Sequence, residues 1–486
     1  MHFSRILIPG RNCWIADVPV QASGLLIDGR QYYRAFYEVA RQAQRSILIT
    51  GWKFNSHVKL LRGEDAREAG EVDLLEFLRQ LCEQKPELRI YILAWDYSWI
   101  YAMEWEWGLE SKFQHAGGRL QFRFDSEHAV GGSHHQKFVV IDNSVAFVGG
   151  LDFNADDWDD RDHLPHNPLR GTSEKPHGPY HDIQASLVGP AALELAKYFK
   201  TRWERAGHNG LELHAPLPLA SVDVGRPIHG QSVALSLNQP KTMSFPESTL
   251  EIRNLYEDAI RAAREMIYME NQYFSADAVA NVLAERMEDR SLPALDIAVI
   301  QPKQAPGWVE AAAMEPGRLH WIKELSALAE RTGHRLRFYY SAAAGRDGNE
   351  VATLIHSKLM IVDDRFLTVG SANTSNRSQG LDTELNVSWE ANGLEDEALR
   401  DSIRTARVDL LAEHCGFLAS GGAPPAELQR RRGLVEYLDQ LAASRNSRLR
   451  FLTPEVILQA RQWLGQLEWL GVSLDPKYPI VEEALS

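Results

Sequence analysis

Residues 134–142 read HHQKFVVID, and residues 355–363 read IHSKLMIVD. The two stretches match at a constant offset of 221 residues, which pairs His135 with His356. The match continues downstream, where GGLD at residues 149–152 returns as GSAN at residues 370–373. This internal repeat decides the fold, because it predicts two similar halves within one chain.

Each copy of the repeat has the pattern of a β-hairpin. Four apolar residues lead to a polar pair at 142–143 or 363–364, and a second apolar run follows at 145–148 or 366–369. Short apolar runs joined by a turn of Asp and Asn are typical of adjacent strands. We therefore predict the same hairpin twice.

The remaining periodicity predicts an α/β fold. Buried strands are expected at residues 46–50, 88–93, 266–269, 295–300 and 336–340, and helices at 30–45, 72–84, 190–205, 250–265, 276–289 and 318–331. Strands that alternate with helices indicate layered α/β architecture in both halves.

Proline and glycine mark the boundaries between these regions. Pro216, Pro218 and Pro227 fall in a stretch without periodicity, and Gly421 and Gly422 precede a helical pattern. We predict an N-terminal half at residues 1–215, a linker at 216–230, a C-terminal half at 231–418 and a helical tail at 419–486. Within the tail, a helix is expected to begin at Thr453-Pro454 and to end near Gly471.

The overall charge limits the classes of ligand. A formal net charge of -14 argues against a broad basic surface for nucleic acid, and it disfavours tight docking on anionic lipid. Cys13, Cys82 and Cys415 lack the spacing of a disulfide framework or a zinc site. Neither a secretory signal peptide nor a transmembrane segment is predicted.

The repeat places matched functional groups in both halves. Residues i and i+2 of a strand point to the same face, so His135 projects with Lys137, and His356 with Lys358. A pseudo-two-fold axis would bring two imidazoles and two ammonium groups around one cavity suited to a phosphodiester. One histidine could attack phosphorus while the other protonates the leaving oxygen, with no metal needed. A single His-x-Lys is usually a surface or structural histidine, but two copies with the same downstream spacing favour catalysis.

These motifs resemble the phospholipase D superfamily, in which His-x-Lys-x4-Asp-x6-Gly-x-x-Asn occurs twice. The segments GGLD (149–152), PYHD (179–182) and ENQYF (270–274) also resemble lipid-cleaving members, and the resemblance covers about residues 20–415. It implies two α/β/α sandwich halves related by a pseudo-two-fold axis, followed by the helical appendage.

The resemblance also implies catalytic roles. His135 would be the nucleophile that forms a phosphohistidine, and His356 the acid that protonates the departing alcohol and then activates water. Asp182 resembles the carboxylate that orients the first histidine, and Glu384 its counterpart for the second. Lys137 and Lys358, together with Asn373, would hold the non-bridging phosphate oxygens.

Further substrate-binding candidates are Asp152, His181 and Ser371. Asp152 departs from the asparagine of the broad pattern, and an ionised carboxylate there would repel the phosphate. Asp142 and Asp363 lie in the hairpin turns, an odd number of residues from their histidines, so we predict a structural role for both.

Three weaker signals have structural explanations. The loop at 155–181 carries His163, His166, His177 and His181, but their spacing does not support a metal site, and we expect a loop near the cavity. Trp95, Tyr97, Trp99, Tyr101, Trp105 and Trp107 could line an acyl-chain entrance or simply pack. The segment Pro306 to Gly317, with Trp308, is expected to be a loop, which could form a mobile rim.

We expect an enzyme that cleaves the distal phosphodiester of glycerophospholipids to phosphatidic acid and a head-group alcohol. Alternatives are transfer to other alcohols, as in cardiolipin-synthase-like members, a nuclease, and a non-catalytic lipid-binding module. The expected partners are a phospholipid at a membrane or micelle surface and a water or alcohol acceptor. We predict a monomer without cofactor, metal or nucleic acid, bacterial in origin, and either cytoplasmic or exported without a Sec signal.

Overall fold

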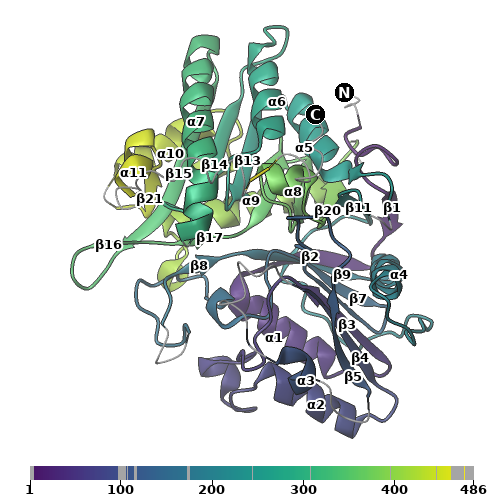
Figure 1. The fold of residues 1–486 in the computed structure, drawn as a ribbon. Coiled ribbons are helices and arrows are strands. Elements are labelled where there is room, and N and C mark those ends of the chain that lie inside the picture. The colour runs from purple at the N-terminus through teal and green to yellow at the C-terminus, as the bar shows by residue number, and fades with distance from the viewer. Residues whose placement is uncertain are drawn as a thin grey trace.

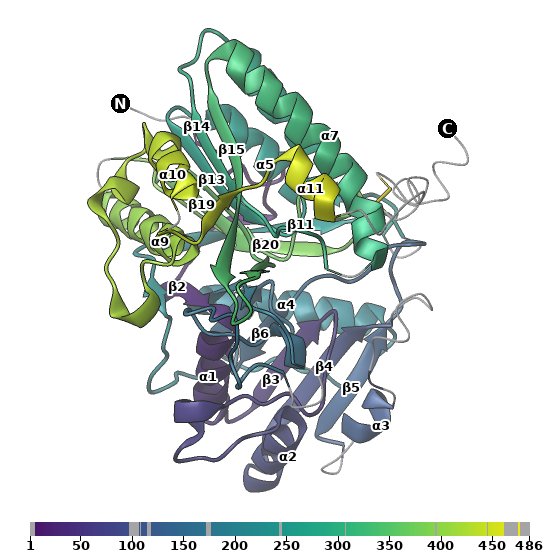
Figure 2. The same cartoon turned by 90° about the vertical axis from the view of Figure 1, so that its left-hand side faces the viewer.

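Two β-sheets form the framework of the molecule (Figures 1 and 2). The structure is a computed structural model that describes residues 5–96, 106, 108–113, 118–171, 176–242, 245–306, 308–393, 396–444, 446–460 and 475–476. Six residues named in the sequence-based expectations lie outside the described residues: Tyr97, Trp99, Tyr101, Trp105, Trp107 and Gly471.

The first sheet has eight strands in the order β10-β2-β9-β7-β6-β3-β4-β5. Its strands are β2 (Ala22–Ile27), β3 (Ser46–Gly51), β4 (Arg89–Trp95), β5 (Leu120–Asp125), β6 (Phe138–Ile141), β7 (Val145–Gly149), β9 (Ile183–Val188) and β10 (Arg226–Pro227). Its helices are α1 (Asp28–Ala40), α2 (Leu74–Gln84), α3 (Leu109–Phe113) and α4 (Pro190–Arg205). Alternate strand residues face opposite sides, so Ile47 and Ile49 pack with α1 and α2, while Leu48 packs with α4.

The second sheet has the order β1-β11-β20-β19-β18-β13-β14-β15-β16, with β12 beside β11 and β21 beside β15. Its strands are β1 (Ile15–Pro19), β11 (Ser232–Gln239), β12 (Thr249–Leu250), β13 (Met266–Asn271), β14 (Asp296–Ile300), β15 (Arg335–Ala344), β16 (Glu350–Ala352), β18 (Lys358–Val362), β19 (Phe366–Gly370), β20 (Glu384–Glu390) and β21 (Leu449–Phe451). A separate parallel pair joins β8 (Tyr180–His181) to β17 (Leu354–Ile355).

Helices cover the outer face of the second sheet, and a shared core lies between the two sheets. The helices of this part of the chain, on either face of the sheet, are α5 (Glu251–Ala262), α6 (Asp277–Glu288), α7 (Trp308–Thr332), α8 (Asn376–Gly380), α9 (Glu397–Cys415), α10 (Leu434–Ala443) and α11 (Pro454–Ala460). Apolar residues of α5, α6 and α7 form the outer core, whereas the inner core contains residues of both sheets together with α4 and α9. The predicted α/β class is confirmed.

The two predicted hairpins are present. β6 pairs antiparallel with β7, and β18 pairs antiparallel with β19. Both residues of each turn, Asp142 and Asn143 or Asp363 and Asp364, have φ between +48° and +56°. Two consecutive left-handed residues are typical of the tight turns that match the twist of a hairpin, and Asp and Asn tolerate this conformation.

Several strands cross the predicted domain boundaries. β1 lies within the predicted N-terminal half but pairs with β11 of the second sheet, and β10 of the predicted linker pairs with β2. The predicted helical tail contributes β21, which pairs with β15, so it is not purely helical. The proposed division of the chain therefore describes the repeat better than it describes the sheets.

The expectation of a loop at Pro306 to Gly317 is wrong, because α7 begins at Trp308 and includes Pro316. Tertiary contacts hold this end of the helix. Arg318 forms a buried ion pair with Glu315 and donates to the main-chain oxygen atom of Pro302. Pro316 is the ninth of the 25 residues of α7, so it removes one interior main-chain hydrogen bond, and contacts such as these offset that loss.

Candidate active site

The two motif histidines precede the first strands of the two hairpins. His135 lies just before β6, and its main-chain N–H donates to Thr383 O at 3.0 Å. His356 lies just before β18, and its N–H donates to His181 O at 2.8 Å. Each histidine is therefore held by backbone of the other half, and the pseudo-two-fold relation of the repeat extends to these contacts.

Each imidazole is oriented by a carboxylate of the opposite half. Nδ1 of His135 lies 3.0 Å from both oxygens of Glu384, and Nδ1 of His356 lies 2.6 Å from Asp182 Oδ2. The predicted assignment was reversed: Asp182 orients the second histidine and Glu384 the first. The reason is the crossing just described, which places the motif of one half beside the β9 or β20 edge of the other.

Both histidines line one cavity of about 670 Å³, so the motifs converge as the repeat predicted. Trp52, Trp95, Tyr180 and Tyr273 contribute aromatic walls to this cavity. A volume of this order is typical of a site for a small molecule or a lipid head group with part of its glycerol. Trp95 of the predicted aromatic run stacks on Trp52, with ring centroids 5.6 Å apart.

Each motif lysine donates to the main-chain oxygen of its own histidine, but the remaining partners of the two lysines differ. Lys137 Nζ lies 3.2 Å from Asp152 Oδ2, and both side chains are buried at the cavity wall. Lys358 Nζ donates to His356 O and contacts Gln272 Oε1 at 3.3 Å. The charge of Asp152, which the sequence suggested would repel a phosphate, is therefore matched by Lys137.

Asn373 occupies the position that pairs with Asp152 in the repeat. It lines the cavity and is 4% exposed, and its Oδ1 accepts no hydrogen bond from the described residues. A buried polar atom of this kind is typical of a position that contacts a ligand. Gln272, which the sequence reasoning did not single out, also lines the cavity and belongs to the ENQYF segment.

In the first dyad, formed by His135 and Glu384, burial favours the protonated form of the carboxyl group. Burial and the neighbouring Asp382 raise the pKa of Glu384 to about 8. Burial, reinforced by Lys137 and Lys358, lowers the pKa of His135 well below its ordinary value. Near neutral pH, the Glu384 carboxyl is therefore protonated rather than ionised.

In the second dyad, formed by His356 and Asp182, the pKa of the carboxyl group is lowered rather than raised. Burial alone would raise the pKa of Asp182, but the adjacent His356 lowers it below the ordinary value. Burial and the Lys358 ammonium lower the pKa of His356 to about 3. Asp182 is thus ionised across the physiological range, and it stands ready to stabilise a proton on His356.

Two predicted substrate-binding residues lie behind the site instead. Ser371 is fully buried, and its hydroxyl donates to Glu384 Oε2, so it supports the carboxylate rather than the substrate. His181 is also fully buried, with ring nitrogens directed at Asp28 and Glu270. Strand alternation explains this, because His181 immediately precedes Asp182 and points to the opposite side.

The two hairpin aspartates, Asp142 and Asp363, bind main-chain N–H groups. The Asp142 carboxylate accepts hydrogen bonds from the main-chain N–H groups of residues 44–46, and the Asp363 carboxylate accepts them from residues 264–266. Both sets of distances are 2.7–2.9 Å. These contacts support the structural role predicted for both residues.

Comparison with known proteins agrees with this architecture. The family model described as "Phospholipase D" matches residues 119–300, and the model described as "Cardiolipin synthase, PLD-like domain" matches residues 256–401. The structure of phosphatidylserine synthase from Haemophilus influenzae Rd KW20 covers 88% of this chain and 95% of its own, with a TM-score of 0.53 and 14% identity. This likeness shows the fold alone.

Curated relatives are similar at low identity. "Phospholipase D A" of Dictyostelium discoideum is 26% identical over 468 residues, which are 82% of this chain and 36% of the relative. "Phospholipase D alpha 2" of Oryza sativa subsp. japonica is 26% identical over 548 residues, covering 85% of this chain and 67% of the relative. The chain thus spans about a third of the first relative's length and two thirds of the second's.

The matched models, the relatives and the duplicated motif identify the family: the chain belongs to the phospholipase D superfamily. The relatives named here come from an amoeba and a plant, which does not support the expected bacterial origin. Within the described part of the chain, no helix combines the length and hydrophobicity needed to span a bilayer. The predicted compartment and monomeric state stay predictions.

Proposed function

We propose that this chain hydrolyses the distal phosphodiester bond of glycerophospholipids, releasing a head-group alcohol and phosphatidic acid. The observation that carries the proposal is the pair of histidines on one cavity, each held through Nδ1 by a buried carboxylate. A histidine held in this way presents its other nitrogen, Nε2, to a substrate.

In the first step, Nε2 of His135 attacks phosphorus while the bond to the head-group oxygen breaks. The electron pair of that bond stays on the oxygen, which takes a proton from His356. The bound phosphodiester brings a negative charge into the cavity, which favours the protonated form of His356 that this step needs. Asp182 stabilises that imidazolium, and the Lys137 and Lys358 ammonium groups offset charge on the phosphoryl oxygens.

In the second step, neutral His356 takes a proton from water as the water oxygen bonds to phosphorus. The bond from phosphorus to His135 Nε2 breaks, which restores both histidines and releases phosphatidic acid. An alcohol in place of water would give a new phosphodiester by the same bond changes. The match to a model described as cardiolipin synthase supports such transfer as a second activity.

A lipid fits the site better than a nucleic acid does. The cavity walls carry five aromatic side chains of Trp, Tyr and Phe, and the chain has a formal net charge of -14. Continuous binding of a polynucleotide backbone requires clustered basic residues, which this balance disfavours. A single head group needs only the local charge of two lysines.

The proposal is tested by incubating the chain with phosphatidylcholine, phosphatidylglycerol and single-stranded DNA in parallel. We expect head-group release from lipid and no cleavage of DNA, and His135→Ala should reduce release by on the order of 10⁴-fold. The exposed loop variant His166→Ala serves as the matched control and should retain activity.

The covalent intermediate has its own test. In His356→Ala, water is no longer activated, so an acid-labile phosphoenzyme should accumulate with a labelled lipid that has a good leaving group. Full activity of His135→Ala, or the same phosphoenzyme in the double variant lacking both histidines, would contradict the mechanism. Added ethanol, assayed for phosphatidylethanol, separates transfer from hydrolysis.

A further inference from the structure

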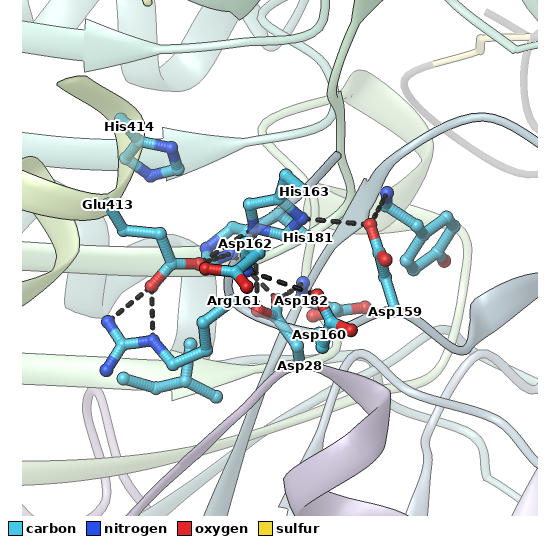
Figure 3. Close-up of polar contacts among 12 residues, drawn as sticks. Asp28, Asp159, Asp160, Arg161, Asp162, His163, His181, Asp182, Glu413 and His414 are labelled. Carbon is cyan, nitrogen blue, oxygen red and sulfur yellow. Dashed lines mark hydrogen bonds and ion pairs between the residues drawn. The ribbon is translucent and has the colours of Figure 1, made fainter. Parts of the chain in front are cut away.

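Behind the Asp182 dyad lies a second cluster of histidines and carboxylates that the proposed chemistry does not use (Figure 3). It consists of Asp28 at the start of α1, His163 in the loop after β7, His181 in β8 and Glu413 in the last turn of α9. All four side chains are 0–3% exposed. The cluster thus joins elements that are far apart in the sequence.

The facing atoms of these four residues converge on one point. Glu413 Oε1 lies 2.8 Å from His163 Nε2 and 3.0 Å from His181 Nδ1. Asp28 Oδ1 lies 2.9 Å from His181 Nδ1, and Asp28 Oδ2 lies 3.4 Å from His163 Nε2. One atom from each residue can be chosen so that all lie within 4.8 Å of one another.

The outward ring nitrogens have carboxylate partners of their own. His163 Nδ1 lies 2.9 Å from Asp159 Oδ2, and His181 Nε2 lies 2.9 Å from Glu270 Oε2. A carboxylate that accepts the outer N–H of an imidazole leaves the lone pair of the inner nitrogen directed at the shared point. This arrangement is common around histidines that bind metal ions.

A separate observation concerns Asp28. Its Oδ2 is buried, accepts no hydrogen bond from the described residues and faces the cluster. Leaving a carboxylate oxygen buried without a donor is costly. The backbone of Asp28 also has φ +66°, a conformation that few side chains adopt and that here directs the carboxylate inward.

The charged groups in contact with the cluster leave a negative balance. Five carboxylates are in contact here, Asp28, Asp159, Glu270, Asp409 and Glu413, against three guanidinium groups, Arg161, Arg170 and Arg226. With neutral imidazoles the net charge is therefore about two units negative. One divalent cation, or one extra proton on each of the two histidines, restores neutrality.

We propose that Asp28, His163, His181 and Glu413 bind one divalent transition-metal ion, with zinc as the first candidate. Two imidazole nitrogens and two carboxylate oxygens form a donor set that suits zinc, and complete burial leaves no open coordination position, as in structural sites. Calcium and magnesium prefer oxygen ligands alone. The sequence did not indicate this site, because Asp28 and Glu413 lie far from the histidine-rich loop.

The site goes beyond the proposed function, since none of its four residues lines the active-site cavity. It is nevertheless linked to that cavity through Asp182. The Asp28 N–H donates to Asp182 O at 2.8 Å, and the Asp182 N–H contacts Asp28 Oδ1 at 3.3 Å. A metal ion bound by Asp28 would therefore hold in place the residue that orients His356.

Metal content of the full-length chain tests the proposal directly. The chain is purified without chelator, freed of any affinity tag and analysed by inductively coupled plasma mass spectrometry. We expect about one zinc per chain, a loss of zinc in His163→Gln and in Glu413→Gln, and full retention in the control His166→Gln. A folded chain without stoichiometric metal, both as purified and after dialysis against zinc chloride, overturns the proposal.

Two further measurements keep the test decisive if the variants do not fold. In crystals of the unaltered chain, anomalous scattering at the zinc edge should give a peak among the four side chains, and a peak only elsewhere overturns the assignment. In the competing state, the cluster holds two additional protons instead of a metal ion. The pKa of His163 agrees with that state: burial lowers it, but Asp28, Asp159 and Glu413 together raise it to about 10. Imidazole nitrogen NMR that shows both histidines doubly protonated in the purified chain would establish that state and exclude the metal.

Discussion

The two halves of the repeat supply the same residue types to the cavity but surround them differently. His135 faces Glu384, whose pKa is raised to about 8, whereas His356 faces Asp182, whose pKa is lowered. Asp182 carries the charge that stabilises a proton on His356 at neutral pH, whereas Glu384 becomes ionised, and leaves the Nε2 lone pair of His135 free, only as the pH approaches about 8. The difference between the carboxylates therefore indicates that the two halves have separate tasks despite their similar sequences.

The residue behind each carboxylate differs as well. Ser371 donates to Glu384, and the paired position in the other half is Gly150. A Cβ atom at Gly150 would lie 2.7 Å from Asp182 Cγ, well inside van der Waals contact. The small residue thus makes room for Asp182, while the serine fills the matching space and adds a hydrogen bond.

The largest expected loss of kcat distinguishes the dyad of Asp182 and His356 from the dyad of Glu384 and His135. Asp182→Asn removes the charge that stabilises protonated His356, so kcat at pH 7 should fall by about 10³- to 10⁴-fold. Glu384→Gln should cost much less at this pH, because only a minor fraction of Glu384 is ionised there and the Gln side-chain oxygen can still accept Nδ1–H of His135. Steady-state head-group release measures both, with melting temperatures to verify folding, and equal losses would remove the proposed division of tasks.

Gly150→Ala should reduce kcat less than Asp182→Asn does, but still strongly. The added methyl group displaces Asp182, and a misplaced carboxylate should reduce kcat by on the order of 10²-fold. Ser371→Ala removes one hydrogen bond to Glu384 and should cost about tenfold or less. Equal losses of activity in the two variants would show that position 150 does not need glycine to make room for Asp182.

The hairpin aspartates should behave alike, in contrast to the dyads. Asp142→Ala and Asp363→Ala each leave three main-chain N–H groups without their acceptor, so each should lower the free energy of unfolding by about 2–3 kcal/mol. Urea denaturation followed by circular dichroism measures this change. A large loss of activity in a variant of unchanged stability would point to a catalytic role instead.

The pH dependence of the unaltered chain should reflect the first dyad. Glu384 binds a proton below pH about 8, and loss of that proton lets the carboxylate accept Nδ1–H of His135 and leaves Nε2 unprotonated. We therefore expect kcat, measured at saturating substrate where the bound phosphodiester favours protonated His356, to rise with pH up to about 8, by up to about tenfold per pH unit. Glu384→Gln does not titrate, so its profile should lack this rise, and an unchanged rise would assign the titration to another group.

The smallest effect concerns the pair of Lys137 and Asp152. Asp152→Asn makes this half resemble the one with Asn373 and frees the lysine from its ion pair. We expect KM for an anionic phospholipid to fall by severalfold, about 1 kcal/mol, with little change in kcat. A raised KM would mean instead that Asp152 is needed to position Lys137.

The sequence predicted what depends on local periodicity and on the repeat. The hairpins, the convergence of His135 with His356 and the alternation of strands and helices all follow from spacing. Contacts between the halves could not be predicted, because Asp182 directly precedes β9 and Glu384 begins β20, each in its own half, but each binds the histidine of the other. Strand alternation would have shown that His181 cannot share the side of Asp182.

The position of β1 has a consequence for how the chain reaches its native state. This strand is synthesised long before its partner β11, which begins at Ser232, after all the strands of the first sheet. The main-chain groups of β1 therefore stay without their strand partner during synthesis until β11 has left the ribosome. A truncated chain that stops before β11 would carry an unpaired strand, which makes separate expression of the first half prone to aggregation.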